Sequence, residues 1–471
     1  MSRELRILSF PGAAALLVFV VFHFTIRWEW SLLMDEVGFN EWMPKVPDFF
    51  AALAGEVRTY WEQGRFNPAK YAINLFKWRY LPNDPGVQHL VSLLNLLFVL
   101  AAGSWAALRA ARDTRAMPAI DKAAWVLFLC GFGLLQRPLL DIAALNTIPE
   151  SYVVVFFVLG LLCFPKRPVL YRGFFVLCAL AKEPGAVAFL GSAVVWALSA
   201  WLDSQRRRAH LRALAIDAAV FAVLAFVAFK AKNAGPYLAG YSLTDPANAG
   251  KFALGLVKVA LGLIPAAILF DGPELKKSLT PLSGANRLRL LCLVFGLCYL
   301  FLVTARVPAG YLVLPASFAF FILVASLMAE AAPFSRPKLF AFALMFLVFF
   351  SVSFARYERF TRGINASTAA FHALLKTSHP RLILMEANEA AAAGRLIAAK
   401  RGAPVKVAEV LKDKMPEARA GDYADVVFLE FTNYFGRTPD ARLEALGKRF
   451  GGWKTAVDRG VYRVFCTCAS F

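Results

Sequence analysis

Long apolar runs separated by short polar segments fill the first three quarters of the chain. A helix of about 17–25 apolar residues can cross the roughly 30 Å of hydrocarbon in a bilayer. Eleven runs approach or reach that length, and the fourth and fifth are the shortest. They cover residues 7–26, 88–107, 123–139, 151–165, 171–182, 185–202, 213–231, 252–270, 289–305, 311–330 and 338–355. The pattern therefore predicts about 11 transmembrane helices.

The pattern changes after residue 355. Short apolar runs, at Leu382 to Met385, Val426 to Leu429 and Val461 to Phe465, alternate with helix-like stretches at Glu389 to Lys400 and Asp440 to Phe450. This alternation is typical of a small α/β domain. We therefore predict a transmembrane domain at residues 1–355 and a C-terminal α/β domain at residues 356–471.

Composition supports a polytopic membrane protein and excludes a soluble globular one. Of the 471 residues, 59% are apolar and 18% are charged, whereas soluble domains contain about 25% charged residues. The net charge of +20 does not indicate a nucleic-acid partner, because the Lys and Arg residues cluster in every second loop. Cytoplasmic loops carry such an excess of positive charge. The N-terminus is therefore predicted inside and the C-terminal domain outside.

The short basic loops favour a bacterial inner membrane, with the C-terminal domain in the periplasm. Arg27 and Trp28 follow the first apolar run where a signal peptide would have small residues, so this run is interpreted as an uncleaved helix. The first outer loop, residues 27–87, is the longest. Within it, residues 46–61 have the spacing of an amphipathic helix. Such a helix lies in the membrane interface or is simply exposed, and the spacing does not separate the two.

Acidic and basic residues recur at the predicted outer ends of the spans. A carboxylate there can accept a proton from a hydroxyl or bind a divalent metal, and a Lys or Arg can neutralise a phosphate. The alternative is that these are interfacial charges, with Lys182 and Glu183 paired to each other. The residues concerned are Asp35, Glu36, Arg137, Glu150, Lys182, Glu183, Arg306 and Tyr311.

Four short motifs resemble the GT-C membrane glycosyltransferases, especially the protein O-mannosyltransferase and aminoarabinose transferase branch. They are Asp35-Glu36-Val37 in the first outer loop, Pro149-Glu150-Ser151, Ala181-Lys182-Glu183-Pro184-Gly185, and Arg306 with Tyr311 and Pro315. The long first outer loop, the odd number of spans and the outer C-terminal domain also match. Two departures stand out: Gly38 replaces a His common in the mannosyltransferases, and four residues separate Arg306 from Tyr311.

The resemblance implies an inverting transfer of a sugar from a polyprenyl-phosphate donor to a hydroxyl of a protein, lipid or glycan. It implies that Asp35 is the general base and that Glu36 assists it. The donor phosphate would bind Lys182, Arg306 and Arg137. The sugar or the acceptor would bind Glu150, Glu183 and Tyr311. Whether a divalent cation (Mg²⁺ or Mn²⁺) takes part is left open, and Asp35, Glu36 and Glu150 are the acids that would hold it.

A transporter or flippase of a lipid-linked or anionic solute is the alternative function. Transporters of that kind often have internal repeats and charges near the middle of the bilayer. We find no clear repeat, and the charges noted above lie at span ends, which favours the transferase.

Cys466 and Cys468 form a C-x-C pair on a predicted strand, where both side chains would point to the same face. A packed terminal strand is the favoured interpretation of this pair, and a metal or redox role is the alternative.

Overall fold

The computed structural model describes most of the chain and forms two compact units. The described residues are 3–28, 48–82, 84–111, 117–145, 148–234, 246–270, 284–304, 311–385, 391, 394–395, 397–399, 402–410, 422–430, 438–460 and 462–468. The helical unit contains Met1–Phe24, Asp48–Asn74 and Leu90–Ala355, and the sheet unit contains Thr25–Pro47, Leu75–His89 and Arg356–Phe471.

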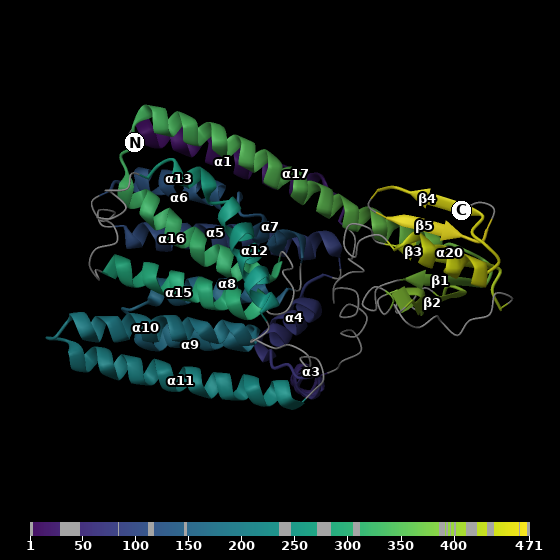
Figure 1. Cartoon of the computed structure of the whole chain (residues 1–471), viewed down its shortest axis with the longest axis horizontal. Helices are drawn as coiled ribbons and strands as arrows, with labels where there is room; N and C mark the ends of the chain where they lie inside the picture. The colour runs from purple at the N-terminus through teal and green to yellow at the C-terminus, as the bar shows by residue number, and fades with distance from the viewer. Residues whose placement is uncertain are drawn as a thin grey trace. The chain divides into compact units, whose positions relative to one another are not determined.

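The helices follow one another in the order of the predicted apolar runs (Figure 1). They are α1 (Arg3–Thr25), α3 (Phe49–Glu62), α4 (Pro68–Tyr80), α5 (Pro85–Ala110), α6 (Ala119–Gly133), α7 (Arg137–Ala144), α8 (Pro149–Cys163), α9 (Pro168–Ala181), the 3₁₀ helix η2 (Glu183–Ala186), α10 (Val187–Leu202), α11 (Arg207–Ala234), α12 (Ala247–Leu261), α13 (Ile264–Ala267), α15 (Gly284–Thr304), η4 (Tyr311–Val313), α16 (Leu314–Ala331) and α17 (Arg336–Leu374).

Within the described residues, 7 helices are long and apolar enough to span a membrane, or 8 when α6 and α7 are taken as one bent span. The chain is thus a helical polytopic membrane protein. The predicted span at 123–139 is not one straight helix: α6 and α7 meet at 89°, as in a broken span or a re-entrant loop. Pro138 stands in the first turn of α7 and cannot continue the ladder of hydrogen bonds from α6. The predicted spans at 151–165 and 171–182 are the shorter apolar helices α8 and α9.

Burial separates the central helices from the peripheral ones. Of the apolar window in α16, 83% is buried, whereas in α11 only 6% is buried. Figure 1 shows α9, α10 and α11 side by side, and α10 also packs against α15. An apolar helix that packs along one side and is otherwise unburied is expected to face lipid, so α11 lies at the edge of the helical unit.

Two glycines let α1 and α6 cross at short range. A Cβ atom on Gly131 would lie 2.3 Å from the Cα atom of Gly12. Small residues at helix crossings allow this close backbone approach in membrane proteins. The crossing therefore requires glycine at both positions.

Prolines mark the beginning of many helices. Helices α4, α5, α8 and α9 each begin at a proline, and α7, η2, α16 and α17 have one at the second position. The first amides of a helix have no partner within the helix, and proline has no amide hydrogen to leave unpaired. Proline thus fixes where each of these helices starts.

A buried carboxylate joins α9, α10 and α11. Asp217 of α11 is fully buried and accepts hydrogen bonds from Tyr171 at 2.9 Å, Arg172 at 2.6 Å, Ser192 at 2.7 Å and Trp196 at 3.0 Å. Asp217 lies inside a predicted span, so the expectation that charges occur only at span ends is wrong for this residue. Its donors explain how a charge is accommodated there.

The sheet unit contains a mixed five-stranded sheet. The strands are β1 (Arg381–Met385), β2 (Val405–Glu409), β3 (Asp425–Glu430), β4 (Thr455–Asp458) and β5 (Arg463–Cys466), in the order β2-β1-β3-β5-β4. The first three are parallel, and β5 is antiparallel to both β3 and β4. The strand patterns at 382–385, 426–429 and 461–465 are confirmed, and β2 and β4 were not predicted.

Helices cover both faces of this sheet. Leu382 and Leu384 of β1 pack with Leu443 and Leu446 of α20 (Asp440–Arg449). The alternate residues Ile383 and Met385 pack in a second cluster that includes residues of α17. Side chains of successive strand residues point to opposite faces, so the apolar run of β1 fills two cores.

Candidate active site

Three predicted site residues lie outside the described residues. They are Asp35 and Glu36 in the first outer loop and Arg306 before η4. Their roles as base and phosphate ligand stay predictions. The site is therefore built from the remaining candidates.

Glu150 and Lys182 form a buried ion pair. Glu150 lies in the first turn of α8 and is fully buried, and Lys182 directly follows α9 and is 7% exposed. An acid near a helix N-terminus and a cation near a helix C-terminus are both favoured by the helix dipoles. Since α8 and α9 pack against each other, the two charges meet at one end of this helix pair.

The turn after α9 is encoded in Lys182-Glu183-Pro184-Gly185. The residue before a proline is disfavoured in a helix, and Lys182 is already extended, with φ −159° and ψ 134°. A Cβ atom on Gly185 would lie 2.3 Å from the carbonyl oxygen of Cys178. The proline and the glycine together turn the chain sharply and place Lys182 and Glu183 at the end of α9.

The partner of Glu183 is the loop between α3 and α4 and not its neighbour Lys182. Its Oε1 accepts a hydrogen bond from the backbone N–H of Phe66 at 2.8 Å. The side-chain amide of Asn67, with its nitrogen towards Glu183, donates to both carboxylate oxygens at 3.0 Å. The interpretation that Lys182 and Glu183 pair with each other is therefore wrong, because each has a different partner.

Several buried polar groups near these charges have no hydrogen-bond partner within the described part of the chain. They are Glu150 Oε2, the hydroxyls of Tyr71 and Tyr299, and Nδ2 of Asn74. Tyr299 is within electrostatic range of Glu150 and Glu183, and Tyr71 is within range of Glu183. A buried polar atom without a partner is costly. These atoms are suited to bind a polar ligand or water.

Tyr71, Asn74 and Tyr299 were not among the predicted site residues. Asn74 accepts a hydrogen bond from the hydroxyl of Tyr152, two residues after Glu150, at 2.5 Å. Tyr71 stacks on Tyr60 with their ring centroids 4.4 Å apart. Burial, followed by the nearby Tyr60, raises the pKa of Tyr71 well above its usual value, so its hydroxyl stays protonated.

Lys70 adds a second buried cation in α4. It is 4% exposed, and its Nζ lies 5.6 Å from the ring centroid of Tyr71 and 6.0 Å from that of Tyr60. Cations near aromatic faces are attracted by the ring quadrupole. A cation thus lies against the same tyrosine whose hydroxyl has no hydrogen-bond partner among the described residues.

The other predicted residues are placed separately. Arg137 forms an ion pair with Asp141, four residues further along α7. Tyr311 begins η4 and is half-buried. A role for either residue in donor or acceptor binding stays a prediction.

The described acids at this end have protein partners. Glu150 is bound to a Lys ammonium, and Glu183 already accepts hydrogen bonds. Among the described residues, Asp425, Cys466 and Cys468 are grouped closely enough to hold a metal, but the two cysteines are joined in a disulfide and could do so only when reduced. A cation held by Asp35 and Glu36 stays a prediction.

Comparison with solved structures decides the fold. Neither a family model nor a curated protein sequence matches the chain. The crystal structure of ArnT from Cupriavidus metallidurans in the apo state matches with a TM-score of 0.54 and 14% sequence identity, over 97% of each chain. The chain has the ArnT fold. ArnT is an aminoarabinose transferase, a GT-C membrane glycosyltransferase, so the match confirms the motif resemblance at the level of the fold.

A second structure of ArnT, bound to undecaprenyl phosphate, matches with a TM-score of 0.48 and 15% identity. That match covers 87% of this chain and 89% of ArnT.

Proposed function

We propose that this protein is an integral membrane glycosyltransferase that uses a polyprenyl-phosphate sugar as its donor. The observation that carries the proposal is the ArnT fold over 97% of both chains. A fold alone does not establish an activity, so the residues must supply the rest of the argument. The buried Glu150–Lys182 pair and the unpartnered polar atoms around it provide this support.

Lys182 suits the neutralisation of a leaving phosphate. When the bond from the sugar C1 to the phosphate oxygen breaks, the carrier leaves as a phosphate monoester with an additional negative charge. Lys182 is 7% exposed, and a cation in a water-excluded site stabilises such charge far better than one in water. While no phosphate is bound, Glu150 supplies the countercharge that a buried Lys requires.

The acceptor would attack from the face of the sugar opposite to the phosphate. In the proposed reaction Asp35 removes the proton of the acceptor hydroxyl as its oxygen bonds to C1, and the configuration at C1 inverts. Tyr71 and Tyr299 carry buried hydroxyls that can donate to sugar oxygens. Glu183 holds the Phe66-Asn67 segment, which immediately precedes α4 and Tyr71.

The proposal includes the finer membrane topology. Eleven crossings, with the N-terminus in the cytoplasm, would place the Glu150–Lys182 end of α8 and α9 and residues 356–471 on the periplasmic side of a bacterial inner membrane. The basic loops support this orientation. Neither the fold nor the site specifies which sugar is transferred or which hydroxyl accepts it.

The test is transfer of label from radiolabelled polyprenyl-phosphate sugars in membranes that contain the native chain or Asp35→Asn. Loss of a general base should reduce transfer by about 10²-fold or more. Asp422→Asn, at an exposed position of the sheet unit, is the matched control. Folding of each variant is checked by monodisperse elution in detergent.

Sugar release by the native chain and the control, but not by Asp35→Asn, would support the proposal. If every chain is inert while the native chain moves the intact carrier across vesicles, the transporter alternative holds instead.

A further inference from the structure

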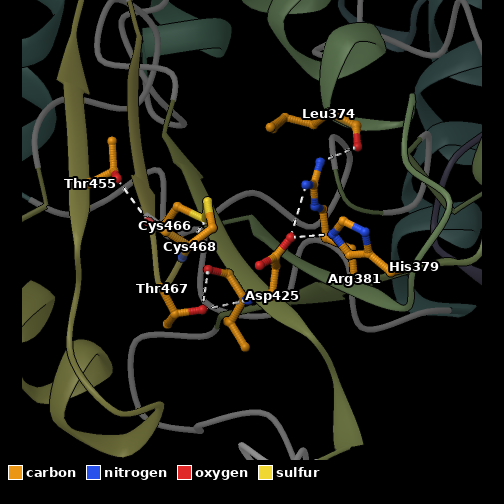
Figure 2. The surroundings of a disulfide bond; sticks show 9 residues. Leu374, His379, Arg381, Asp425, Thr455, Cys466, Thr467 and Cys468 are labelled. Atoms are coloured by element: carbon orange, nitrogen blue, oxygen red, sulfur yellow. Dashed lines mark hydrogen bonds and ion pairs between the residues drawn. A yellow bond between two sulfur atoms is a disulfide. The ribbon is translucent and has the colours of Figure 1, made fainter. Parts of the chain in front are cut away.

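Cys466 and Cys468 form a disulfide at the end of β5 (Figure 2). They are separated by a single residue, Thr467. The five other cysteines, Cys130, Cys163, Cys178, Cys292 and Cys298, are free. The prediction that both side chains of the C-x-C pair point to one face is confirmed, and the interpretation as simple packing is incomplete.

This disulfide adds little structural restraint. Cross-links stabilise a protein mainly in proportion to the chain loop that they close, and this loop is minimal. The strand is already held, because Cys466 pairs in register with Val427 of β3 and Thr455 of β4. Beyond the strand, Thr467 and Cys468 are bound to Val426 and Thr455 by backbone and side-chain hydrogen bonds. A role other than cross-linking must be considered.

The two sulfurs have unequal surroundings. Cys466 is fully buried within the apolar cluster that contains Phe371 and Val464, whereas Cys468 is partly exposed. The backbone N–H of Cys468 donates to Sγ of Cys466 at 3.0 Å. A thiolate released at Cys466 would keep this donor. An external thiol can reach Cys468 more readily.

A buried carboxylate lies beside the sulfurs. An oxygen of Asp425 and the two Sγ atoms lie within 4.8 Å of one another. Asp425 accepts hydrogen bonds from His379 at 2.6 Å and from Arg381 at 3.0 Å, and Figure 2 shows both donors on one side of it. It is thus held and neutralised by two basic residues close to the disulfide.

We propose that Cys466 and Cys468 are a redox-active pair that exchanges two electrons with external dithiols. An external thiolate attacks Sγ of Cys468, the Cys466–Cys468 bond breaks, and its electron pair leaves on Cys466 as a thiolate. The second thiol of the dithiol is then deprotonated. It attacks the sulfur of the mixed disulfide that came from the dithiol, and Cys468 is released. The dithiol becomes a disulfide, and its two protons end on Cys466 and Cys468.

The proposal is independent of the proposed transferase activity, so failure of either assay leaves the other standing. The full chain is incubated in nanodiscs with equal concentrations of reduced and oxidised dithiothreitol, and free thiols are trapped with a maleimide. Cleavage after Arg463 releases residues 464–471, which contain Cys466 and Cys468 and no other cysteine. Mass spectrometry then counts the labels on this peptide.

We expect the doubly labelled peptide to exceed the disulfide form by more than tenfold, and oxidised glutathione to restore the disulfide. Labile disulfides are reduced under such conditions, whereas structural ones resist. A disulfide form that still exceeds the labelled form by tenfold would overturn the proposal. Binding of one Zn²⁺ per reduced chain that blocks reoxidation would also overturn it, in favour of a metal site.

A matched pair of variants tests which sulfur is attacked. Cys466→Ser leaves Cys468 as the only thiol of the pair, and Cys468→Ser leaves Cys466. We expect oxidised glutathione to modify the first variant at least tenfold faster than the second, measured on the same peptide. Equal rates would contradict the assignment of Cys468 as the attacked residue.

Discussion

A buried carboxylate lies beside each end of α9, and the two carboxylates differ in how many of their hydrogen-bonding positions are filled. Near its start, Tyr171 and Arg172 help to surround Asp217 with four donors. Directly after its end, Lys182 is the residue that pairs with Glu150, and Glu150 Oε2 has no partner within the described residues. A saturated carboxylate joins helices, whereas one with a free oxygen retains the capacity to bind. We therefore propose a structural role for Asp217 and a binding role for Glu150.

The largest effect is expected at the Glu150 end. Lys182→Met should lower sugar transfer by about 10²–10³-fold, because the leaving phosphate loses its cation. It should also lower stability by about 3–5 kcal/mol, since Glu150 remains buried and unpaired. Transfer assays and thermal unfolding in detergent measure the two effects.

The double variant Glu150→Gln/Lys182→Met separates the effect on sugar transfer from the effect on stability. Removing both charges should restore most of the stability but none of the transfer. Lys376→Met, at an exposed position, is the control. A double variant that regains activity would show that the pair is structural, like Asp217.

The opposite result is expected at the other end of α9. Asp217→Ala leaves Arg172 and three other donors without their acceptor, and should cost about 3–5 kcal/mol. The protein that remains folded should transfer sugar within about twofold of the native rate. Unfolding temperature and activity per folded molecule are the measurements. A large loss of activity with unchanged stability would contradict the structural role.

Asp425, in the sheet unit, is a third buried carboxylate with donors in place, so it too should contribute to stability. Burial alone would raise its pKa, but hydrogen bonds from His379 and Arg381 and their charges outweigh burial and lower it. Its contribution to stability is therefore present above the unfolded pKa, about 3.9, and is lost as the pH falls through the lower folded value.

Asp425→Asn should thus cost about 1–3 kcal/mol at pH 7 and progressively less below pH 4. Chemical denaturation of the full chain at a series of pH values, with native and variant compared, would show this convergence. A difference that grows on acidification would contradict the assignment.

The smallest effect comes from a pair of tyrosines that are both fully buried. The Tyr171 hydroxyl is bonded to Asp217, whereas the Tyr299 hydroxyl has no hydrogen-bond partner in the part of the chain that the structure describes. Tyr171→Phe should cost about 1 kcal/mol with activity unchanged. Tyr299→Phe should leave stability unchanged and reduce transfer by about tenfold. The same two assays apply, and a reversal of the two outcomes would argue against the division of roles.

The sequence predicted the helical fold well because apolar runs and prolines are local signals. Pro149-Glu150 and Lys182-Glu183-Pro184-Gly185 also placed two charges at the predicted outer ends of their helices, and the structure brings Glu150 and Lys182 together. The pairing itself was not predicted, since Lys182 has an equally plausible partner next to it in Glu183. Only the packing of α8 on α9 selects Glu150.

The contribution of Tyr71 and Tyr299 to the site also depends on how the helices pack, so it could not be predicted. Tyr71 and Tyr299 are ordinary aromatic residues in helical patterns, and their unpartnered hydroxyls are visible only after packing. Asp217, however, had a local signal, because a charge within an apolar run is rarely incidental. In the sheet unit, the alternating Val405-Lys406-Val407 of β2 was also a detectable strand pattern.

The prolines at the helix starts bear on how such a chain can evolve. Each one sets a helix boundary with a single residue, and a lipid-facing helix such as α11 requires of its surface only that it be apolar. Most positions are then free to exchange one apolar residue for another. A fold defined by a few such boundary residues can be formed by sequences as different as those of this chain and ArnT, which are 14% identical.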